Sequence, residues 1–559
     1  MNLKRINWLV VSLALLGIVF FFVYSWFAAS VIQPQTEKNS GHEIFSWPDA
    51  MANNFFIDQF IKTGEFVKEE PYNVVLKQLI HPRSTNVVNN DIVPSGFLGL
   101  LFIFGWLGKI FTGKVIMFIT PTLAVLGIWT FYLIVKEFLS RRAAFISAIL
   151  LALLAPYWYY SNLSLLSTVP FAVLLMIGFY FLIKQNSLVL NRNQYICAAL
   201  SGLFIGLAIS TRYLEIVWVG LFVLVVWLFH AREVKWQQIL FFVLGGLIPL
   251  ATILFYNFQT YGEMFTVGYL QMGNQTAGVL DRLPTEFEST TGKDWKAYLK
   301  LILMPFGFHP KIIAINLKNY MFEFLWPYCL TFGMGGLWWV VNAFRKKVTR
   351  AEVVFAVSSF IGAFWLVVYY GSWVFVDQLV LKHNTIGSSY TRYWLPLVIL
   401  FLPVIAYLLD NILKIRIIPA LKYLLVIMLI SWLGIYSFGL VYYTPGDGLF
   451  SQRGVINTYY DQYQKVNSLV EYDAIIINNR ADKLFFPEKR VIMFDLNYAI
   501  FPVIEKIVDE APFFYYTLMP EKDINYINNK KINEFGLRLV DPQIIDHQFK
   551  LYRLIKVGD

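Results

Sequence analysis

A polar stretch at residues 45–97 contains side chains suited to catalysis, within a chain that is otherwise strongly apolar. Asp49 stands in the segment Trp47-Pro48-Asp49-Ala50. Pro48 at a helix start predicts that Asp49 lies in the first helical turn, where the helix dipole favours a carboxylate. Such a residue is either an ordinary helix-start acid or a general base, which must approach its hydroxyl to about 2.6–3.2 Å. Asp49 is therefore the candidate catalytic base.

A histidine and an arginine flank a proline later in the same stretch, as His81-Pro82-Arg83. A guanidinium group is well suited to holding a phosphate, and a histidine can assist it. The alternative is that both side chains only hold the loop together through hydrogen bonds to the backbone. We keep His81 and Arg83 as secondary candidates for binding a donor phosphate.

Arg212 and Glu215 lie between two apolar runs that have almost no loop between them. An ionisable residue at the centre of a membrane helix costs about 2.5–3.5 kcal/mol, so such residues usually face a partner or a cavity. The two residues are either a structural pair at i,i+3 spacing, or Arg212 faces a cavity and meets an anionic ligand.

Two more basic residues, Lys382 and Arg392, occur in the segment 382–396, KHNTIGSSYTRYWLP, at the start of an apolar run. Arg392 and Tyr393 could be interfacial anchors, because arginine and tyrosine favour the headgroup level. The alternative is contact with a phosphate, which the position of both cations in a short outer loop favours.

The composition places this chain in a membrane. Of its 559 residues, 57% are hydrophobic and 15% are charged, whereas soluble domains carry roughly 25% charged residues. The net charge of +10 does not indicate nucleic-acid binding, because no basic run is interleaved with stacking aromatic residues outside the apolar segments. The two cysteines give neither a disulfide framework nor metal-ligand spacing.

Runs of spanning length, about 20 residues, predict a polytopic α-helical membrane protein with about eleven transmembrane helices. The run at 95–113 is shorter and interrupted by glycines, so we expect it to lie in the interface. The eleven runs are 7–29, 115–135, 143–160, 165–183, 195–211, 213–230, 237–256, 320–342, 352–371, 393–410 and 420–441.

Charge sets the predicted orientation. With the N-terminus in the cytoplasm, basic residues gather in every inner connection, whereas the short outer connections hold only Arg212, Lys382 and Arg392. The alternative has twelve spans and an outer N-terminus; it leaves Lys4 and Arg5 outside. In the preferred topology, three large segments face outward: residues 30–114, 257–319 and the tail after about residue 442.

The tail predicts a small α/β domain outside the cytoplasm. Short strand-like runs alternate there with a helical stretch at 524–535, and the segment is long enough for a core of its own. We therefore divide the chain into a transmembrane domain, 1–444, and a soluble C-terminal domain, 445–559. The latter lacks a Gly-rich phosphate loop and is interpreted as accessory.

Together these parts resemble the GT-C glycosyltransferases, in particular the group of protein O-mannosyltransferases and aminoarabinose transferases. The resemblance rests on layout and on four segments: SWPDAMANNFFIDQFIKTGEF, HPR…VPSGF, GLAISTRY and GSSYTRYWLP. It implies a polyprenyl-phosphate-linked sugar donor, with Asp49 as the base or acceptor-positioning group and Arg392 as the ligand of the lipid phosphate.

Two departures from that family matter. Ala50 follows Asp49 where the family often has a glutamate, and Asn162 and Ser164 stand where oligosaccharyltransferase relatives carry an acidic metal-binding motif. The second departure favours a metal-independent enzyme without a cofactor, although it does not exclude a divalent ion.

The sequence thus predicts an inverting glycosyltransferase of the plasma or inner membrane. It would move a sugar from polyprenyl phosphate to a protein, lipid or glycan acceptor on the outer face. Asp49 would act as base, and Arg392, Lys382, Arg212, Arg83 and His81 would bind the phosphate. The alternatives are a transporter or flippase of lipid-linked sugars and a non-catalytic membrane scaffold. The first would show broken spans with charges at the midplane.

Overall fold

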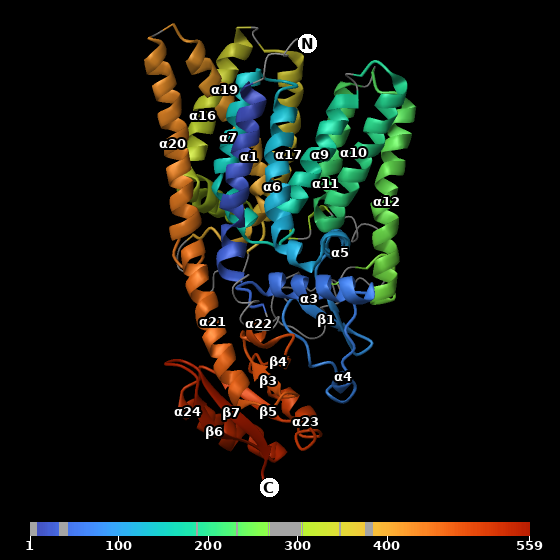
Figure 1. The fold of residues 1–559 in the computed structure, drawn as a ribbon, viewed down its shortest axis with the longest axis vertical. Helices are drawn as coiled ribbons and strands as arrows, with labels where there is room; N and C mark the ends of the chain where they lie inside the picture. Colours follow the sequence, from blue (N-terminus) through green and yellow to red (C-terminus); the bar gives the residue numbers. More distant parts are fainter. Residues whose placement is uncertain are drawn as a thin grey trace. The chain divides into compact units, whose positions relative to one another are not determined.

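The structure is a computed structural model, and it is mostly helical (Figure 1). It describes residues 8–32, 43–185, 188–230, 233–266, 268, 303–304, 306–345, 348–374, 384–416 and 418–558. Contacts divide the chain into two compact units. The first comprises 1–27, 117–253 and 275–451, and the second comprises 28–116, 254–274 and 452–559.

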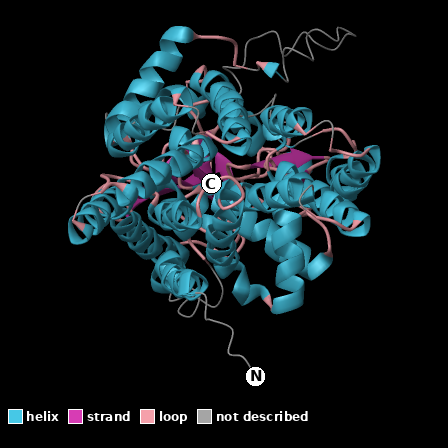
Figure 2. Ribbon diagram, turned by 90° about the horizontal axis from the view of Figure 1, so that it is seen from above, coloured by secondary structure: helices cyan, strands magenta, loops and turns pink. Residues whose placement is uncertain are grey.

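Long apolar helices build the first unit, where they run alongside one another in Figure 1 and are seen nearly end-on in Figure 2. The helices of this unit are α1 (Trp8–Phe27), α6 (Ile116–Val135), α7 (Arg141–Leu153), α8 (Ala155–Asn162), α9 (Thr168–Lys184), α10 (Asn191–Thr211), α11 (Ile216–Phe229), α12 (Trp236–Tyr261), α15 (Pro310–Leu317), α16 (Trp326–Phe344), α17 (Arg350–Gly371), α18 (Ser389–Tyr393), α19 (Leu395–Lys414) and α20 (Pro419–Tyr443). Of these, α8, α15 and α18 are short, with eight residues or fewer.

Each of the eleven predicted runs contains a helix, but they differ in length and straightness. Among the described residues, seven helices are long and apolar enough to span a membrane, or up to nine if each bent pair is one span. The bent pairs are α7 with α8, at 53°, and the segment Pro310–Phe324 with α16, at 94°. Pro156 and Pro327 lie in the first turn after these breaks, where proline is tolerated. The remaining runs are α9, with 17 residues, and Tyr213–Phe229.

The centre of the helical unit differs from its rim. In the most apolar 18-residue stretch of α19, 67% is buried inside the protein, whereas in the corresponding stretch of α12 only 17% is buried. Leucine and phenylalanine side chains of α12 are exposed, as expected of a surface that faces lipid. The chain is therefore an integral multi-pass membrane protein, with α19 near its core.

The second unit begins with α3 (Pro48–Thr63), which ends at Gly64 in the left-handed conformation. This helix packs on α5 (Leu98–Phe111), where Gly105 leaves room for the ring of Phe60. With 14 residues, α5 is about 21 Å long, which is shorter than a hydrocarbon core of about 30 Å. Between them lie α4 (Tyr72–Val75) and the hairpin of β1 (Thr85–Val88) and β2 (Asp91–Pro94).

The C-terminal segment forms a five-stranded mixed sheet in the order β4-β3-β5-β7-β6. The predicted helical stretch at 524–535 and the strand-like runs predicted at 472–479, 490–496, 513–519 and 549–557 are confirmed, whereas β6 was missed because its second half is polar. The elements are α21 (Leu449–Leu469), β3 (Ile475–Asn478), α22 (Asp482–Phe485), β4 (Arg490–Met493), α23 (Phe501–Ile504), β5 (Phe513–Thr517), α24 (Glu521–Ile527), β6 (Leu537–Ile544) and β7 (Lys550–Lys556).

The compact units differ from the two predicted segments. Residues 28–116 and 254–274, which we assigned to the transmembrane domain, group with the C-terminal segment, and residues 445–451 group with the helical unit. For residues 28–116, the reason is a set of contacts with the C-terminal segment. An ion pair joins Glu70 to Arg490 at 2.9 Å, and the rings of Phe55 and Phe486 lie 4.8 Å apart.

Candidate functional site

Arg212 lies at a break between two helices of the first unit. The helix α10 ends at Thr211, Arg212 leaves the helical conformation with φ −158° and ψ 82°, and a short 3-10 turn (Tyr213–Glu215) leads into α11. The break explains the very short connection seen in the sequence. It also places Arg212 and Glu215 inside the unit, where their side chains are 3% and 0% exposed.

Glu215 is fully satisfied, but Arg212 is not. The Glu215 carboxylate accepts hydrogen bonds from Trp218 Nε1, at 2.5 Å, and from the Tyr370 hydroxyl, at 2.8 Å. Arg212 Nη2 lies 2.9 Å from Glu215 Oε1 as an ion pair. Within the described part of the chain, however, neither Nη1 nor Nη2 of Arg212 has a well-directed hydrogen bond. A buried donor without a partner is costly, so this guanidinium has unused capacity for an anion.

Arg392, the other arginine of this unit that we predicted to bind phosphate, contacts the same aromatic ring as Arg212. The ring of Tyr393 has the guanidinium carbon of Arg212 4.5 Å from its centroid and that of Arg392 at 5.7 Å. Tyr393 also stacks on Tyr370 at 4.6 Å. Arginine over an aromatic face is stabilising and keeps its hydrogen-bonding edge available. The structure therefore brings Arg212 and Arg392 together.

Buried polar contacts fix α18, the short helix that carries Arg392. The Tyr160 hydroxyl lies 3.1 Å from the carbonyl oxygen of Ser388 and 3.1 Å from Thr391 Oγ1. Asn316 Nδ2 donates to the Tyr390 hydroxyl at 2.8 Å. Because these partners are buried, the backbone that carries Arg392 has a well-defined place in the fold.

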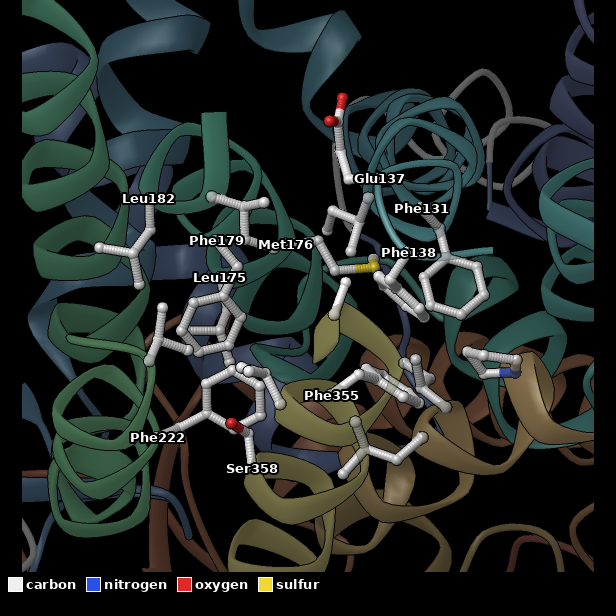
Figure 3. Close-up of a pocket in the computed structure, with 18 of the residues that line it drawn as sticks. Phe131, Glu137, Phe138, Leu175, Met176, Phe179, Leu182, Phe222, Phe355 and Ser358 are labelled. Carbon is white, nitrogen blue, oxygen red and sulfur yellow. The ribbon is translucent and has the colours of Figure 1, made fainter. Parts of the chain in front are cut away.

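An apolar cavity of about 300 Å³ lies within the helical unit (Figure 3). Trp218, which donates to Glu215, lines it together with Phe222 and other aromatic and aliphatic residues of α6, α9, α11, α17 and α19. Along α11 the lining continues from Trp218 to Val226, or about 12 Å of helix rise. It also includes His230 and Glu233, which lie beyond the end of this helix. The volume is at the lower end of ligand pockets, roughly 300–1,000 Å³.

Asp49 lies in the second unit, in the first turn of α3 as predicted. The Ser84 hydroxyl donates to Asp49 Oδ1 at 2.6 Å. Ser84 has a φ of 61°, a left-handed conformation that costs an L-residue roughly 1–2 kcal/mol. The backbone thus holds a strained conformation at the residue that orients the candidate base. Nothing in the sequence marked Ser84.

Arg83 is engaged by a carboxylate of the C-terminal segment. Its Nε donates to Asp482 Oδ1 and its backbone N–H to Asp482 Oδ2, both at 2.8 Å, and Asp482 is fully buried. This geometry favours the structural alternative for Arg83 over phosphate binding. His81 is 6% exposed, and burial lowers its pKa, so it is largely neutral at pH 7. Neither observation supports the phosphate role that we predicted for these two residues.

The residue after Asp482 makes a second contact with the candidate base's surroundings. Lys483 Nζ donates to the Ser46 carbonyl oxygen at 2.6 Å and lies 4.8 Å from the ring centroid of Tyr459. Burial and the charge of Arg83 lower the pKa of Lys483 to about 8. Sequence reasoning missed this lysine because the tail offered no motif around it.

Two predictions are left untested by the geometry. Lys382 falls outside the described residues. Among the residues that are described, no three His, Cys, Asp or Glu side chains are grouped to hold a metal ion, and metal independence stays a prediction. Asn162 and Ser164, at the expected metal position, bond to the backbone instead: Asn162 Oδ1 accepts from the N–H of Phe27 at 3.4 Å, and Ser164 Oγ donates to the carbonyl oxygen of Met117.

Comparisons with known proteins bear on the fold. No protein-family model matches the sequence, and no curated protein sequence does. The structure is similar to that of ArnT from Cupriavidus metallidurans bound to undecaprenyl phosphate, with a TM-score of 0.56, 10% identity and 98% of both chains covered. The apo form of that protein gives 0.52, with 12% identity and 97% of both chains covered.

A second kind of protein shares the architecture. The oligosaccharyltransferase of Archaeoglobus fulgidus, tethered with an acceptor peptide, matches with a TM-score of 0.50 and 12% identity, covering 94% of this chain and 70% of that one. At these identities the likeness concerns the fold: a polytopic helical membrane part with a small C-terminal sheet domain, which is the GT-C type of fold that the sequence predicted.

Proposed function

We propose that this protein is a membrane glycosyltransferase that moves a sugar from a polyprenyl phosphate to an acceptor at the outer face of the membrane. The observation that carries the proposal is Arg212, a buried guanidinium with unused hydrogen-bonding capacity. Its ion-pair partner Glu215 bonds to Trp218, which lines an apolar cavity. Such a site suits an amphiphile with an anionic head and an apolar chain. The solved ArnT structure of the same fold is bound to undecaprenyl phosphate.

In this proposal the first unit binds the donor. Arg212 and Arg392 hold the phosphate, assisted by Lys382, and the isoprenoid chain enters the cavity that begins at Trp218. Glu215 keeps Arg212 in place and offsets one of the positive charges. An environment of low dielectric strengthens the interaction between guanidinium and phosphate, which favours departure of the lipid phosphate as a leaving group.

Asp49 is assigned the role of general base. It removes the proton from an acceptor hydroxyl, whose oxygen forms a new bond to the anomeric carbon. The bond from that carbon to the phosphate oxygen breaks, and its electron pair stays on the lipid phosphate. The reaction is inverting and needs no metal, because arginine side chains supply the positive charge. Ser84 orients the carboxylate of Asp49 for this step.

The test of donor binding compares undecaprenyl phosphate with undecaprenol, measured on the purified full-length protein in detergent by native mass spectrometry. Arg212→Lys retains the charge but removes the planar fork. Because a hydrogen bond to a charged group contributes about 1.5–3 kcal/mol, we expect affinity for undecaprenyl phosphate to fall roughly ten- to hundredfold. Undecaprenol should bind weakly to both proteins.

The matched control is Arg142→Lys. Arg142 also pairs with a buried acid, since its Nε lies 3.2 Å from Asp410 Oδ1, but it has no part in the proposed site. Its variant should bind undecaprenyl phosphate like the unaltered protein. Equal affinity of the unaltered protein for undecaprenol and undecaprenyl phosphate would contradict the proposal.

The rival functions differ in turnover. A transporter or flippase would move the lipid-linked sugar without breaking it, and a scaffold would leave it unchanged. The described cavity lining is mostly apolar, which is a poor route for a sugar. Incubation with a panel of undecaprenyl-phosphate-linked hexoses and pentoses separates these functions, because only a transferase releases undecaprenyl phosphate together with a glycosylated acceptor.

A further inference from the structure

The helix start that presents Asp49 lacks a side-chain cap. Trp47 is at the N-cap position of α3 and provides no side-chain cap, whereas Ser, Thr, Asp or Asn would satisfy a free N–H there. The first backbone bond of the helix, from the Met51 N–H to the Trp47 carbonyl oxygen, is 3.2 Å long. An uncapped start of this kind needs an anchor from elsewhere in the fold.

Lys483 supplies such an anchor. Its ammonium group donates to the Ser46 carbonyl oxygen at 2.6 Å, one residue before the N-cap. The contact is shielded by the ring of Tyr459, 4.8 Å from Nζ, and the charge is surrounded by Arg83, Asp482 and Arg480. A charge-assisted bond in a half-buried setting is stronger than an exposed one.

The partner of Asp49 is held from the same place. Ser84 keeps its left-handed conformation only if the neighbouring structure imposes it. Asp482 does so through the preceding residue, since its carboxylate accepts both the backbone N–H and the Nε of Arg83 at 2.8 Å. Arg83 Nη2 adds a bond to the Arg480 carbonyl oxygen at 2.7 Å.

We infer that Asp482 and Lys483, consecutive residues of α22, are positioning residues that fix the Asp49–Ser84 pair from its two sides. Lys483 holds the helix start that carries Asp49, and Asp482 holds the loop that carries Ser84. The C-terminal segment is then part of the apparatus that orients the base, rather than an accessory domain. The catalytic consequence of this inference rests on the proposed role of Asp49, whereas the positional part does not.

The positional part is tested by amide hydrogen exchange on the full-length protein in detergent. In Lys483→Met we expect exchange in residues 45–53 to become about tenfold faster, because the anchor is lost and the first turn opens locally. The matched control is Lys489→Met. Lys489 is another partly buried lysine of the same segment, and it donates to the carbonyl oxygens of Glu471 and Tyr472 at 2.9 and 3.1 Å, away from α3.

Restored protection in Lys483→Arg, which keeps the cation, supports the inference. Unchanged exchange at 45–53 in Lys483→Met, or equal acceleration in Lys489→Met, overturns it. If Lys483→Met does not fold, Asp482→Asn, which keeps the side-chain volume, carries the test. Faster exchange at residues 83–86 then supports the inference, and unchanged exchange there overturns it.

The catalytic part is read from release of undecaprenyl phosphate from the donor panel described above. Lys483→Met should lower kcat about tenfold and leave the KM for the donor unchanged, and Lys483→Arg should recover most of kcat. A lower kcat in Lys489→Met as well would indicate general destabilisation and contradict this part. If the unaltered protein turns over no donor, the proposed function fails, while the exchange measurement still decides whether α22 positions the pair.

Discussion

The two regions that carry the predicted chemistry are stabilised in opposite ways. Arg212 and Glu215 lie inside the helical unit, where the nearly inaccessible pair is surrounded by Trp218 and the rings of Tyr370 and Tyr393. Asp49 and Ser84 lie at a helix start and a loop of the second unit and are partly exposed. Their geometry depends on contacts from α22, hundreds of residues away in the chain.

This difference suggests that one region binds the phosphate and the other presents the base. A phosphate gains most from charge in a dry, rigid setting, because low dielectric strengthens the interaction. A base must meet an acceptor that arrives from outside, so it needs access and a defined orientation rather than burial. Substitutions in the first region should therefore affect stability and donor affinity together, whereas those in the second should affect turnover with little effect on stability.

The largest expected effect is on turnover, in Asp49→Asn. The amide keeps the shape but cannot take a proton, so we expect sugar transfer to fall by about 10²–10⁴-fold with undecaprenyl phosphate binding unchanged. Release of undecaprenyl phosphate from the donor panel measures the first quantity, and native mass spectrometry measures the second.

Asp58→Asn is the control for that substitution, because Asp58 lies on the same helix but is 52% exposed and pairs with Lys62. An exposed pair of this kind contributes little, about 0.3–0.5 kcal/mol. A folded Asp49→Asn protein that transfers sugar at the normal rate would remove Asp49 from the mechanism.

The next effect is on stability, in Glu215→Gln. This change leaves Arg212 buried without its counter-charge, and breaking a buried pair costs about 3–5 kcal/mol. We expect the free energy of unfolding to fall by that amount in a denaturant titration. Added undecaprenyl phosphate should restore part of it, since a ligand that binds only the folded state stabilises that state.

Glu233→Gln serves as the comparison. Glu233 pairs with Arg350 at 3.9 Å, and both side chains are more than half exposed, so its loss should cost less than about 1 kcal/mol. If the two glutamine variants were equally stable, the buried region would not differ from the surface as the structure indicates.

The sequence predicts the helices better than it predicts the site. Each predicted apolar run contains a helix of the described chain, because hydrophobicity is read locally, although only seven to nine of them are candidate spans. Pro48 correctly indicated the start of α3. Straightness was not predicted: the breaks at Leu154 and Leu325 depend on packing, although Pro156 and Pro327 lie close to them.

The site contacts are long-range, and one sequence cannot reveal them. For Arg83 the sequence left a phosphate role and a structural role open, and it could not indicate Asp482, the partner 399 positions away. The left-handed φ of Ser84 has no sequence signal, since serine is uncommon in that conformation. Arg212 and Glu215 were identified because charge inside apolar sequence is rare and visible. Tyr393, whose ring contacts both Arg212 and Arg392, was interpreted only as an interfacial anchor.

The smallest expected effect is that of Ser84→Gly, which distinguishes the backbone strain at Ser84 from the role of its hydroxyl in orienting Asp49. Glycine adopts a positive φ without strain, so Ser84→Gly relieves the backbone and removes the hydroxyl that orients Asp49. We expect the free energy of unfolding to change by less than about 1 kcal/mol, because the relief offsets the lost hydrogen bond, while kcat falls roughly tenfold.

Asn89→Gly is the matched control: Asn89, with a φ of 53°, lies in the turn between β1 and β2, and its replacement should leave kcat unchanged. A Ser84→Gly protein with unaltered kcat would mean that the strained loop serves the fold and not the base, and the contrast between the two regions would then rest on burial alone.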